Sequence, residues 1–431
     1  YRELKMEIDM LIDLSVISFL GMLTIYIGNW ILINNRRSSW VRRNNEMNRQ
    51  RLQIEIDLIT DRRKIEQKKS DLSWNGFRKF EISDKMEEAK GIFSFYLKPH
   101  DRKPLPPFEP GQFLTFNLHI PGQKKPVIRC YSLSDSPNHP DYYRVTIKRE
   151  PPPYNKPNVA PGLASNFFHN QLKVADIVDV KAPSGHFFLD MSSHKPIVLI
   201  GGGIGLTPGL SMLNSVVESG SLRETHFFYG VRNGKYHAFK KHLQKTTLEN
   251  ENIHLHVCYS EAGEDDVIGE DYHYGEKISV DLLKQHLKSS NYEFYLCGPP
   301  SMMGSLVEGL ETWSVPTNSI HFEAFGPATV KKTSAEDNKE SVSSIETVNV
   351  KFARSNKTTS WDTTQGSILE LAEANGIVNI IAGCRAGNCD SCITAIMDGE
   401  VKYLNPPGSP AEDGSCHTCI SVPKSDLVID A

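Results

Sequence analysis

The sequence predicts a multidomain protein with one N-terminal transmembrane helix, an antiparallel β-barrel domain, an α/β domain and a small C-terminal metal-binding domain. Three observations lead to this prediction. An uncharged apolar run occupies residues 14–33, short β-type segments give way to alternating strands and helices near residue 193, and five of the eight cysteines fall in the last fifty residues. The net charge of −4 over 431 residues gives no general basic surface, so we expect no nucleic-acid partner.

The apolar run reads LSVISFLGMLTIYIGNWILI and is long enough to cross a bilayer core of about 30 Å as a helix. Arginines 36, 37, 42 and 43 follow it, whereas acidic residues precede it, so the positive-inside rule places the rest of the chain in the cytoplasm. A secretory signal peptide has the opposite charge order and a small-residue cleavage site. We therefore assign residues 1–35 to a single-pass membrane anchor in a lipid bilayer. The sequence begins at Tyr1 rather than at a methionine, which leaves the position of its natural start open.

A charged segment, residues 36–73, follows the anchor. It is rich in Arg, Lys, Glu, Asp, Asn and Gln, with sparse apolar residues running through it. This composition predicts a charged helical stalk, which either pairs with a partner helix or serves as a solvated spacer.

The next two domains differ in their periodicity. Residues 74–192 contain short β-type runs (GIFSFYL, QFLTFNL, YRVTIK, DIVDVKA) between Pro- and Gly-rich turns, which predicts an antiparallel barrel or sandwich; we assign a β-barrel. Residues 193–328 alternate apolar strands (IVLI, HFFYGV, HLHVCY, EFYLCG) with helical stretches, which predicts a parallel α/β nucleotide-binding domain. The polar residues 329–346 predict a linker, and residues 347–431 form a separate small domain.

The strongest chemical signal is the C-x4-C-x2-C run of Cys384, Cys389 and Cys392. With one later cysteine, this is the ligand spacing of a plant-type [2Fe–2S] cluster. Three cysteines in one loop argue against structural zinc, whose ligands usually come in two separate pairs. Cys416 and Cys419 both follow the loop, so the spacing alone leaves the fourth ligand open.

The C-terminal domain resembles the plant-type ferredoxins, whose fold is the β-grasp. In that family the last ligand stands in a T-C-x-x-x-P context, which residues 418–423 (TCISVP) match. The resemblance implies that Cys419 is the fourth metal ligand, together with Cys384, Cys389 and Cys392, and that Cys416 is a spare thiol near the cluster.

Residues 129–132 (RCYS), which follow the strand entry PGQF, resemble the flavin motif of the ferredoxin–NADP reductase superfamily. The resemblance implies that Arg129 neutralises a flavin phosphate and that Tyr131 lies along the isoalloxazine ring. It also implies that Ser132 forms a hydrogen bond near flavin N5, where a hydride arrives.

Two further motifs belong to the same predicted flavin site. The strand VTIK, which ends at Lys148, matches the second flavin-contact strand of the superfamily, and GLAS, from Gly162 to Ser165, matches its phosphate turn. A glycine turn with a serine at a helix start also presents free N–H groups to an anionic phosphate on physical grounds. The motifs look closer to FAD-binding than to FMN-binding relatives, so we expect FAD, with FMN as the alternative.

An apolar strand runs into a glycine-rich turn within VLIGGGIGLTP. Its glycines, Gly201, Gly203 and Gly205, let the pyrophosphate of a dinucleotide approach the backbone at the start of a helix. In the reductase superfamily this form of the turn is expected, and the Thr207 position lies beside the nicotinamide.

Three more residues complete the predicted nicotinamide side. The resemblance implies that Cys297, in CGPPSM, helps to orient hydride transfer, and that Glu323 and Phe325, in HFEAFGP, lie at the site, with the phenylalanine covering the flavin. Arg232 ends the strand where the adenine ribose is expected. An acidic residue there would favour NADH and a basic cluster NADPH, so the choice stays open, with a slight preference for NADH.

Residues 75–431 as a whole resemble reductases with the order flavin barrel, nucleotide domain, ferredoxin. The resemblance implies an NAD(P)H oxidoreductase in which Ser132, Cys297, Glu323 and Phe325 serve the hydride transfer and the cluster passes single electrons onward. With the anchor, the expected acceptor is a membrane-associated redox protein such as an oxygenase or desaturase. Two alternatives stay open: reduction of a membrane quinone, and a role as an electron-transfer or assembly subunit of a larger membrane complex.

Overall fold

The structure is a computed structural model that describes residues 2–152, 158, 160–323, 347–385, 387, 389–404, 407 and 411–431. It divides into two compact units, residues 1–70 and residues 71–431. The predicted linker, residues 329–346, lies outside the described residues.

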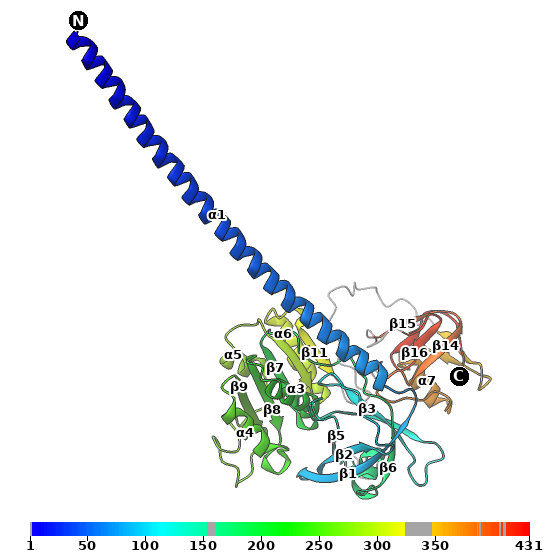
Figure 1. Cartoon of the computed structure of the whole chain (residues 1–431). Coiled ribbons are helices and arrows are strands. Elements are labelled where there is room, and N and C mark those ends of the chain that lie inside the picture. The colour runs from blue at the N-terminus through cyan, green and yellow to red at the C-terminus, as the bar shows by residue number, and fades with distance from the viewer. Residues whose placement is uncertain are drawn as a thin grey trace. The chain divides into compact units, whose positions relative to one another are not determined.

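The first unit consists of the helix α1 (Arg2–Leu72), which Figure 1 shows as one uninterrupted element. The predicted anchor and the predicted helical stalk are continuous in the structure and form one helix of 71 residues. Its segment Leu14–Arg37 is long and apolar enough to cross a membrane, and its most apolar stretch is not buried in the protein. An N-terminal signal sequence can have the same length and apolar composition.

The second unit begins with a six-stranded antiparallel sheet in the order β4-β3-β6-β1-β2-β5, which is the predicted flavin-domain barrel. The phenylalanine Phe168 of the barrel's helix packs edge-to-face on Phe95 and Phe116, with ring centroids 5.2 and 5.3 Å apart, and so closes the barrel core. The elements are β1 (Arg78–Ala89), β2 (Ile92–Pro99), β3 (Phe113–Leu118), β4 (Val127–Ser132), β5 (Tyr143–Lys148), α2 (Leu163–Asn170) and β6 (Ile177–Val180).

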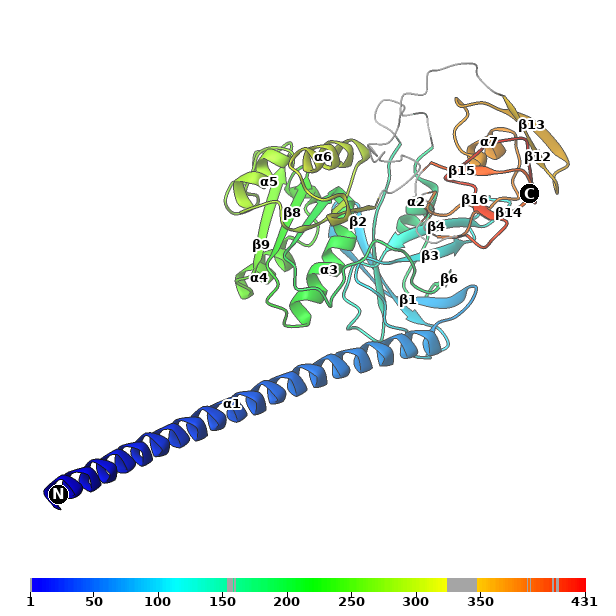
Figure 2. The same ribbon diagram turned by 90° about the horizontal axis from the view of Figure 1, so that it is seen from above.

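A parallel five-stranded sheet in the order β11-β10-β7-β8-β9 follows. Alternate strand residues point to opposite faces, so Leu199 and Phe227 pack with α3 and α4, whereas Val198 and Phe228 pack with α5 and α6. Figure 2 shows these two helix pairs on either side of β8 and β9. The elements are β7 (Ile197–Gly202), α3 (Leu206–Glu218), β8 (Thr225–Val231), α4 (Lys240–Glu249), β9 (Ile253–Tyr259), α5 (Val280–His286), β10 (Glu293–Cys297), α6 (Pro300–Thr312) and β11 (Ile320–Glu323), with 3-10 turns η1 (Gly203–Gly205), η2 (Gly234–Tyr236) and η3 (Thr317–Ser319).

The C-terminal domain has a mixed sheet, β13-β12-β18-β14-β16, and a two-stranded sheet, β15-β17. Its helix begins with a capping box, in which Ser367 and Glu370 each bond the backbone N–H of the other. The elements are β12 (Val348–Phe352), β13 (Lys357–Trp361), α7 (Ile368–Ala374), β14 (Ile393–Asp398), β15 (Val401–Tyr403), β16 (Ser415–His417), β17 (Ser421–Pro423) and β18 (Leu427–Ile429).

A buried polar network joins the barrel to the parallel sheet domain. Asp135, just after β4, accepts a hydrogen bond from Asn214 of α3 at 2.9 Å and pairs with Arg144 of β5 at 3.3 Å. The Ser211 hydroxyl of α3 donates to the Asp135 carbonyl at 2.7 Å. Because Asp135, Ser211 and Asn214 are buried and hydrogen-bonded to one another, they hold the end of β4 against α3.

Candidate functional site

Four strand ends meet where the barrel contacts the parallel sheet. Cys297, the last residue of β10, pairs in register with Gly201 of β7 on one side and with Glu323 of β11 on the other. From the barrel, the hydroxyl of Ser132 at the end of β4 donates to Glu323 Oε2 at 3.5 Å. Since the carboxyl ends of parallel strands are where such sheets bind ligands, this junction is the natural place for chemistry.

The carboxyl group of Glu323 is buried at this junction. Burial raises its pKa from 4.5 to about 8, and the Ser132 hydrogen bond lowers it only in part. Burial and the nearby Glu323 also raise the pKa of the Cys297 thiol well above its usual value. At neutral pH both side chains are therefore protonated, and the junction is neutral and able to donate hydrogen bonds.

The glycine-rich turn after β7 needs its glycines for two different reasons. Gly205 lies so close to β10, the strand paired with β7, that a Cβ there would stand 2.3 Å from the Cys297 carbonyl oxygen. Gly203 has a φ of +56° and open space where a Cβ would be. At Gly205 the turn therefore packs tightly against β10, and at Gly203 its backbone is not covered by a side chain. A bound pyrophosphate requires such an uncovered backbone.

A cavity of about 1240 Å³ opens beside this turn. It is lined by Gly203 from the turn, by Lys148 from β5 and by Arg232 after β8, three of the residues that the sequence singled out. Thr207 does not line it: the side chain is buried, and its hydroxyl donates to the Ile204 carbonyl at 3.0 Å at the start of α3. The cavity is large enough for a dinucleotide and has cationic side chains for its phosphates.

The cationic side chains at the mouth of the cavity already have acidic neighbours. Arg232 lies 3.6 Å from Glu261, with both side chains more than half exposed, and its guanidinium stacks over Tyr236. Lys148 lies 3.5 Å from Glu150. Such exposed pairs are weak, so either cation can turn toward an anionic ligand at little cost.

The residues of the predicted flavin motif lie along β4. Arg129 is exposed, whereas the ring of Tyr131 packs edge-to-face on Phe116 and Phe168, and burial raises the pKa of its phenol. Arg129 Nη1 donates to the Ile128 carbonyl at 2.7 Å. The strand thus offers an exposed cation at Arg129 and a fixed aromatic ring two positions later, at Tyr131.

The helix α2 supplies the predicted phosphate turn. Its N-cap is Gly162, which has no side chain to cap the helix, and the Ser165 hydroxyl in the first turn donates to the Gly162 carbonyl at 3.2 Å. The first N–H groups of an uncapped helix are suited to an anion. These features fit the phosphate end of a flavin nucleotide.

The four predicted cluster ligands lie in two neighbouring pairs. The Cys384 amide donates to the sulfur of Cys389 at 3.1 Å, and the sulfurs of Cys392 and Cys419 are 3.1 Å apart. By contrast, the Cys416 thiol is fully buried and forms a hydrogen bond with the Ser421 side chain. Two pairs of cysteine sulfurs are the donor set that two bridged irons require, so the residues fit a [2Fe–2S] cluster.

One contact joins the cluster loop to the flavin strand. The thiol of Cys130, between Arg129 and Tyr131 in the sequence, lies within hydrogen-bonding reach of the Cys389 sulfur. Nearby, Lys125 Nζ donates to the Val378 carbonyl at 3.1 Å. Sequence reasoning did not assign Cys130, because nothing local marks a residue whose partner stands in a different domain.

The structure adds one further residue and leaves one prediction outside its reach. Met302 of α6 lines the cavity, and its sulfur would stand 2.8 Å from a Cβ at Gly202, so it forms one wall beside the glycine turn. The sequence feature that could have identified Met302 is its place in the CGPPSM motif. Phe325 lies outside the described residues, and its role stays a prediction.

Three family models match the chain in the order of its domains. Residues 79–189 match an oxidoreductase FAD-binding domain, residues 199–308 an oxidoreductase NAD-binding domain and residues 350–424 a 2Fe-2S iron-sulfur cluster binding domain. The chain is an oxidoreductase of the ferredoxin–NADP reductase superfamily. The predicted cofactors FAD, a [2Fe–2S] cluster and NADH or NADPH are confirmed by these matches.

Similar proteins share either the reductase half or the whole domain order. A flavohemoprotein of Halalkalibacterium halodurans is 39% identical over 59% of this chain and 61% of its own length. The flavohem-like FAD/NAD binding domain of a Vibrio cholerae nitric oxide dioxygenase is 31% identical, with a TM-score of 0.52, over 59% of this chain and all of that one. Phthalate dioxygenase reductase, described as a modular structure for electron transfer from pyridine nucleotides to [2Fe–2S], is 27% identical, with a TM-score of 0.51, over 83% of this chain and 98% of its own.

The share of each relative's length that this chain covers decides which properties of that relative support a conclusion about this chain. The chain spans about three fifths of the length of the flavohemoproteins, so it shares only part of those proteins. With phthalate dioxygenase reductase it shares nearly the full length of that protein. The chain is therefore an NAD(P)H-dependent flavin reductase with a [2Fe–2S] domain for electron transfer.

Proposed function

We propose that this reductase is held at a membrane by α1 and delivers single electrons from its cluster to a membrane-associated acceptor such as an oxygenase or desaturase. Bound FAD would accept a hydride and release electrons one at a time, which lets a two-electron donor supply a one-electron cluster. The residues of this chain bind the donor, hold the two redox groups close together and control the protons near them.

The contact between Cys130 and Cys389 is the observation on which this electron route rests. It brings the strand that carries the flavin motif directly against the cluster loop. A Cβ on Gly383, next to Cys384, would stand 3.2 Å from the Ile128 side chain of the same strand. A flavin on β4 would thus have the cluster as its neighbour on one side and the nicotinamide cavity on the other.

On the flavin side, we assign Arg129 to a flavin phosphate, Tyr131 to the edge of the isoalloxazine ring and Ser132 to a hydrogen bond near N5. The uncapped turn at Gly162 and Ser165 would receive the remaining phosphate. These roles follow from one strand and one helix start that already present an exposed cation, an aromatic ring, a buried hydroxyl and free N–H groups.

On the donor side, the turn of Gly201, Gly203 and Gly205 would hold the pyrophosphate, and Arg232 the adenosine end. The neutral Glu323 and Cys297 would lie behind the place where nicotinamide meets flavin. Such a neutral, buried pair would keep water from that place, and Glu323 would hold Ser132 in position through their hydrogen bond. The protonated Glu323 can also hydrogen-bond the nicotinamide amide, which would orient the ring for hydride transfer.

The membrane anchor rests on the apolar segment of α1 and on the arginines that follow it. With this charge order, the three cofactor domains would lie on the cytoplasmic side. An anchor restricts the reductase and its acceptor to one surface, which raises their effective concentration. The name of phthalate dioxygenase reductase supports an oxygenase as the type of acceptor.

Membrane fractionation of the full chain tests the anchor. The double variant Leu20→Lys and Ile25→Lys places two charges in the apolar segment, at a cost of roughly 3 kcal/mol each near a membrane-spanning centre. The matched control, Leu52→Lys with Ile54→Lys, changes similarly exposed residues of the same helix outside that segment. We expect the first variant to leave the membrane fraction and the control to stay. Equal behaviour of both variants would contradict the anchor.

A second measurement distinguishes the acceptors. Membranes that contain the reductase are given NADH, and the redox state of their quinone pool is followed against that of an added oxygenase component. The proposal expects electrons to reach the protein component and the quinone pool to stay oxidised. Rapid quinone reduction that depends on the [2Fe–2S] cluster would instead make the chain a complete quinone reductase.

A further inference from the structure

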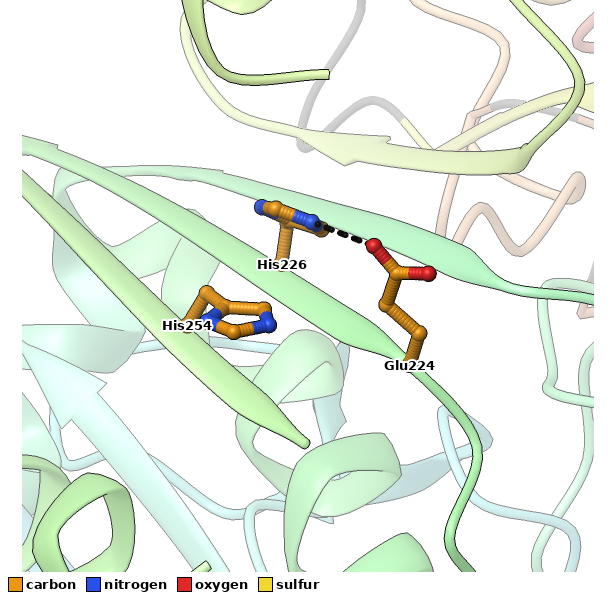
Figure 3. Close-up of side chains that lie close together, drawn as sticks. All are labelled: Glu224, His226 and His254. Carbon is orange, nitrogen blue, oxygen red and sulfur yellow. Dashed lines mark hydrogen bonds and ion pairs between the residues drawn. The ribbon is translucent and has the colours of Figure 1, made fainter. Parts of the chain in front are cut away.

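Three potential metal ligands meet on one face of the parallel sheet, at its amino end. His226 of β8 and His254 of β9 are directly paired across the two strands. Glu224 lies just before β8, and its Oε1 is 3.2 Å from His226 Nε2. Figure 3 shows the two imidazoles and the carboxylate turned toward a common space beside β8.

We propose that Glu224, His226 and His254 form a binding site for a divalent transition metal ion of the zinc type, separate from the redox cofactors. Two imidazole nitrogens and one carboxylate oxygen are a ligand set that zinc and its neighbours in the first transition row accept, with further positions left for water. His254 is the most accessible of the three side chains, so an ion can enter from solvent.

The distances suit such an ion. The three ligand atoms lie within 4.8 Å of one another. His226 Nε2 and Glu224 Oε1 are 3.2 Å apart, close to the spacing of about 3.3 Å between two ligands bonded at about 2.05 Å to one tetrahedral zinc. The rings of His226 and His254 have centroids 4.6 Å apart.

A chain of hydrogen bonds behind His226 can fix the tautomer that a metal needs. His226 Nδ1 lies 3.2 Å from His256 Nε2, His256 Nδ1 lies 3.4 Å from the Tyr274 hydroxyl, and that hydroxyl lies 2.8 Å from His286 Nε2. If each group donates to the next in that order, Nδ1 of His226 carries the proton and Nε2 is left with a lone pair for a metal ion. Metal-bound histidines are usually oriented in this way through their second nitrogen.

One cation, Lys288, faces Glu224 and weakens the attraction of its carboxylate for a metal ion.

The site lies away from the hydride-transfer junction. His226 of β8 is paired with Val198 of β7. Val198 lies four residues before Gly202, which ends β7 at the glycine turn. Four strand residues span about 13 Å. A metal here therefore acts on the sheet, by tying β9 at the edge of the sheet to β8, and leaves the cofactor cavity unobstructed.

The test uses the full-length, oxidised protein with its flavin and cluster in place, treated with a chelator and desalted. Isothermal titration with zinc chloride is expected to show one ion per chain with a micromolar or lower Kd. His254→Asn should weaken binding at least about tenfold, because it removes one of three protein ligands. His119→Asn, which removes an exposed histidine of the barrel, should bind zinc as the parent does.

Two further readouts distinguish binding at these three ligands from binding elsewhere on the chain or at the cluster cysteines. Oxidised FAD and an oxidised [2Fe–2S] cluster give no paramagnetic signal, so added Cu²⁺ should show an unobscured spectrum with coupling to two imidazole nitrogens, reduced to one in His254→Asn. The visible absorbance of the cluster should stay constant throughout. No saturable binding, equal affinity in His254→Asn and the parent, or loss of cluster absorbance as zinc is taken up would each overturn the proposal.

Discussion

The buried carboxyl of Glu323 makes a prediction whose magnitude can be worked out. Its pKa is about 8 in the folded protein, against 4.5 for an exposed glutamate. Between these values the folded state binds a proton that the unfolded state has released, so stability falls as the pH rises through this window. From pH 6 to pH 8, this group alone should remove about 2 kcal/mol from the free energy of unfolding.

The variant Glu323→Gln replaces the neutral carboxyl by a neutral amide of the same shape and has no proton to lose. Near pH 5 the variant and the parent should unfold at similar temperatures. At pH 8 the variant should be more stable by about 3.5 kcal/mol, which corresponds to a melting temperature higher by roughly 7 to 14 °C for a domain of this size.

The assay is thermal unfolding of the FAD-loaded, oxidised protein without nucleotide, followed by near-ultraviolet circular dichroism from pH 5 to pH 9. The difference between variant and parent at each pH cancels the other titrating groups. Glu308→Gln, a change at an exposed glutamate of α6 in the same domain, is the control and should show no pH-dependent difference. A difference for Glu323→Gln that stays constant with pH, or that falls as the pH rises, would refute the reasoning.

Three other predictions follow from the same junctions. Cys419→Ser should abolish the [2Fe–2S] visible and electron paramagnetic resonance spectra, whereas Cys416→Ser should keep both, and the reverse result would move the fourth ligand to Cys416. Cys130→Ala should lower the midpoint potential of the cluster in a spectroelectrochemical titration, because a hydrogen bond to a cluster sulfur favours the reduced state. Cys130→Ser keeps a hydrogen-bond donor and should shift the potential less. Equal potentials in the parent and the alanine variant would contradict this prediction. Gly205→Ala should lower the melting temperature by several degrees, since its Cβ would overlap a backbone oxygen, whereas Gly304→Ala, where the space is open, should not; the prediction fails if both variants melt together.

The parts of the molecule that the sequence predicted well are those that local patterns encode. The spacing of Cys384, Cys389 and Cys392 indicates a cluster loop because all three ligands come from one short segment. The change from barrel to parallel sheet was visible as a change of periodicity, and the structure and the family models confirm the fold class. The choice of Cys419 over Cys416 needed a resemblance, because spacing alone could not separate the two.

The sequence predicted an anchor and a helical stalk in succession, and α1 joins both segments in one continuous helix. No proline or glycine lies between Trp30 and Ser73, so the chain contains no stop signal where the apolar residues end. A change from apolar to charged residues alters what a helix faces without ending the helix.

The contacts that assemble the site were beyond sequence reasoning. Ser132 and Glu323 are 191 residues apart, and only the packing of the barrel on the parallel sheet brings them together. Cys130 and Cys389 likewise meet only because two domains pack against each other. The Thr207 hydroxyl, expected beside the nicotinamide, bonds the Ile204 carbonyl at the helix start, a local bond that competes with any ligand.

The central claim is that one chain moves electrons from a nicotinamide through flavin to the cluster. Anaerobic titration of the purified protein with NADH, and separately with NADPH, tests it directly, with flavin absorbance and the electron paramagnetic resonance of the cluster followed together. We expect at least one nucleotide to bleach the flavin and raise a [2Fe–2S] signal. A cluster that dithionite reduces, in a protein whose flavin neither nucleotide reduces, would contradict this claim.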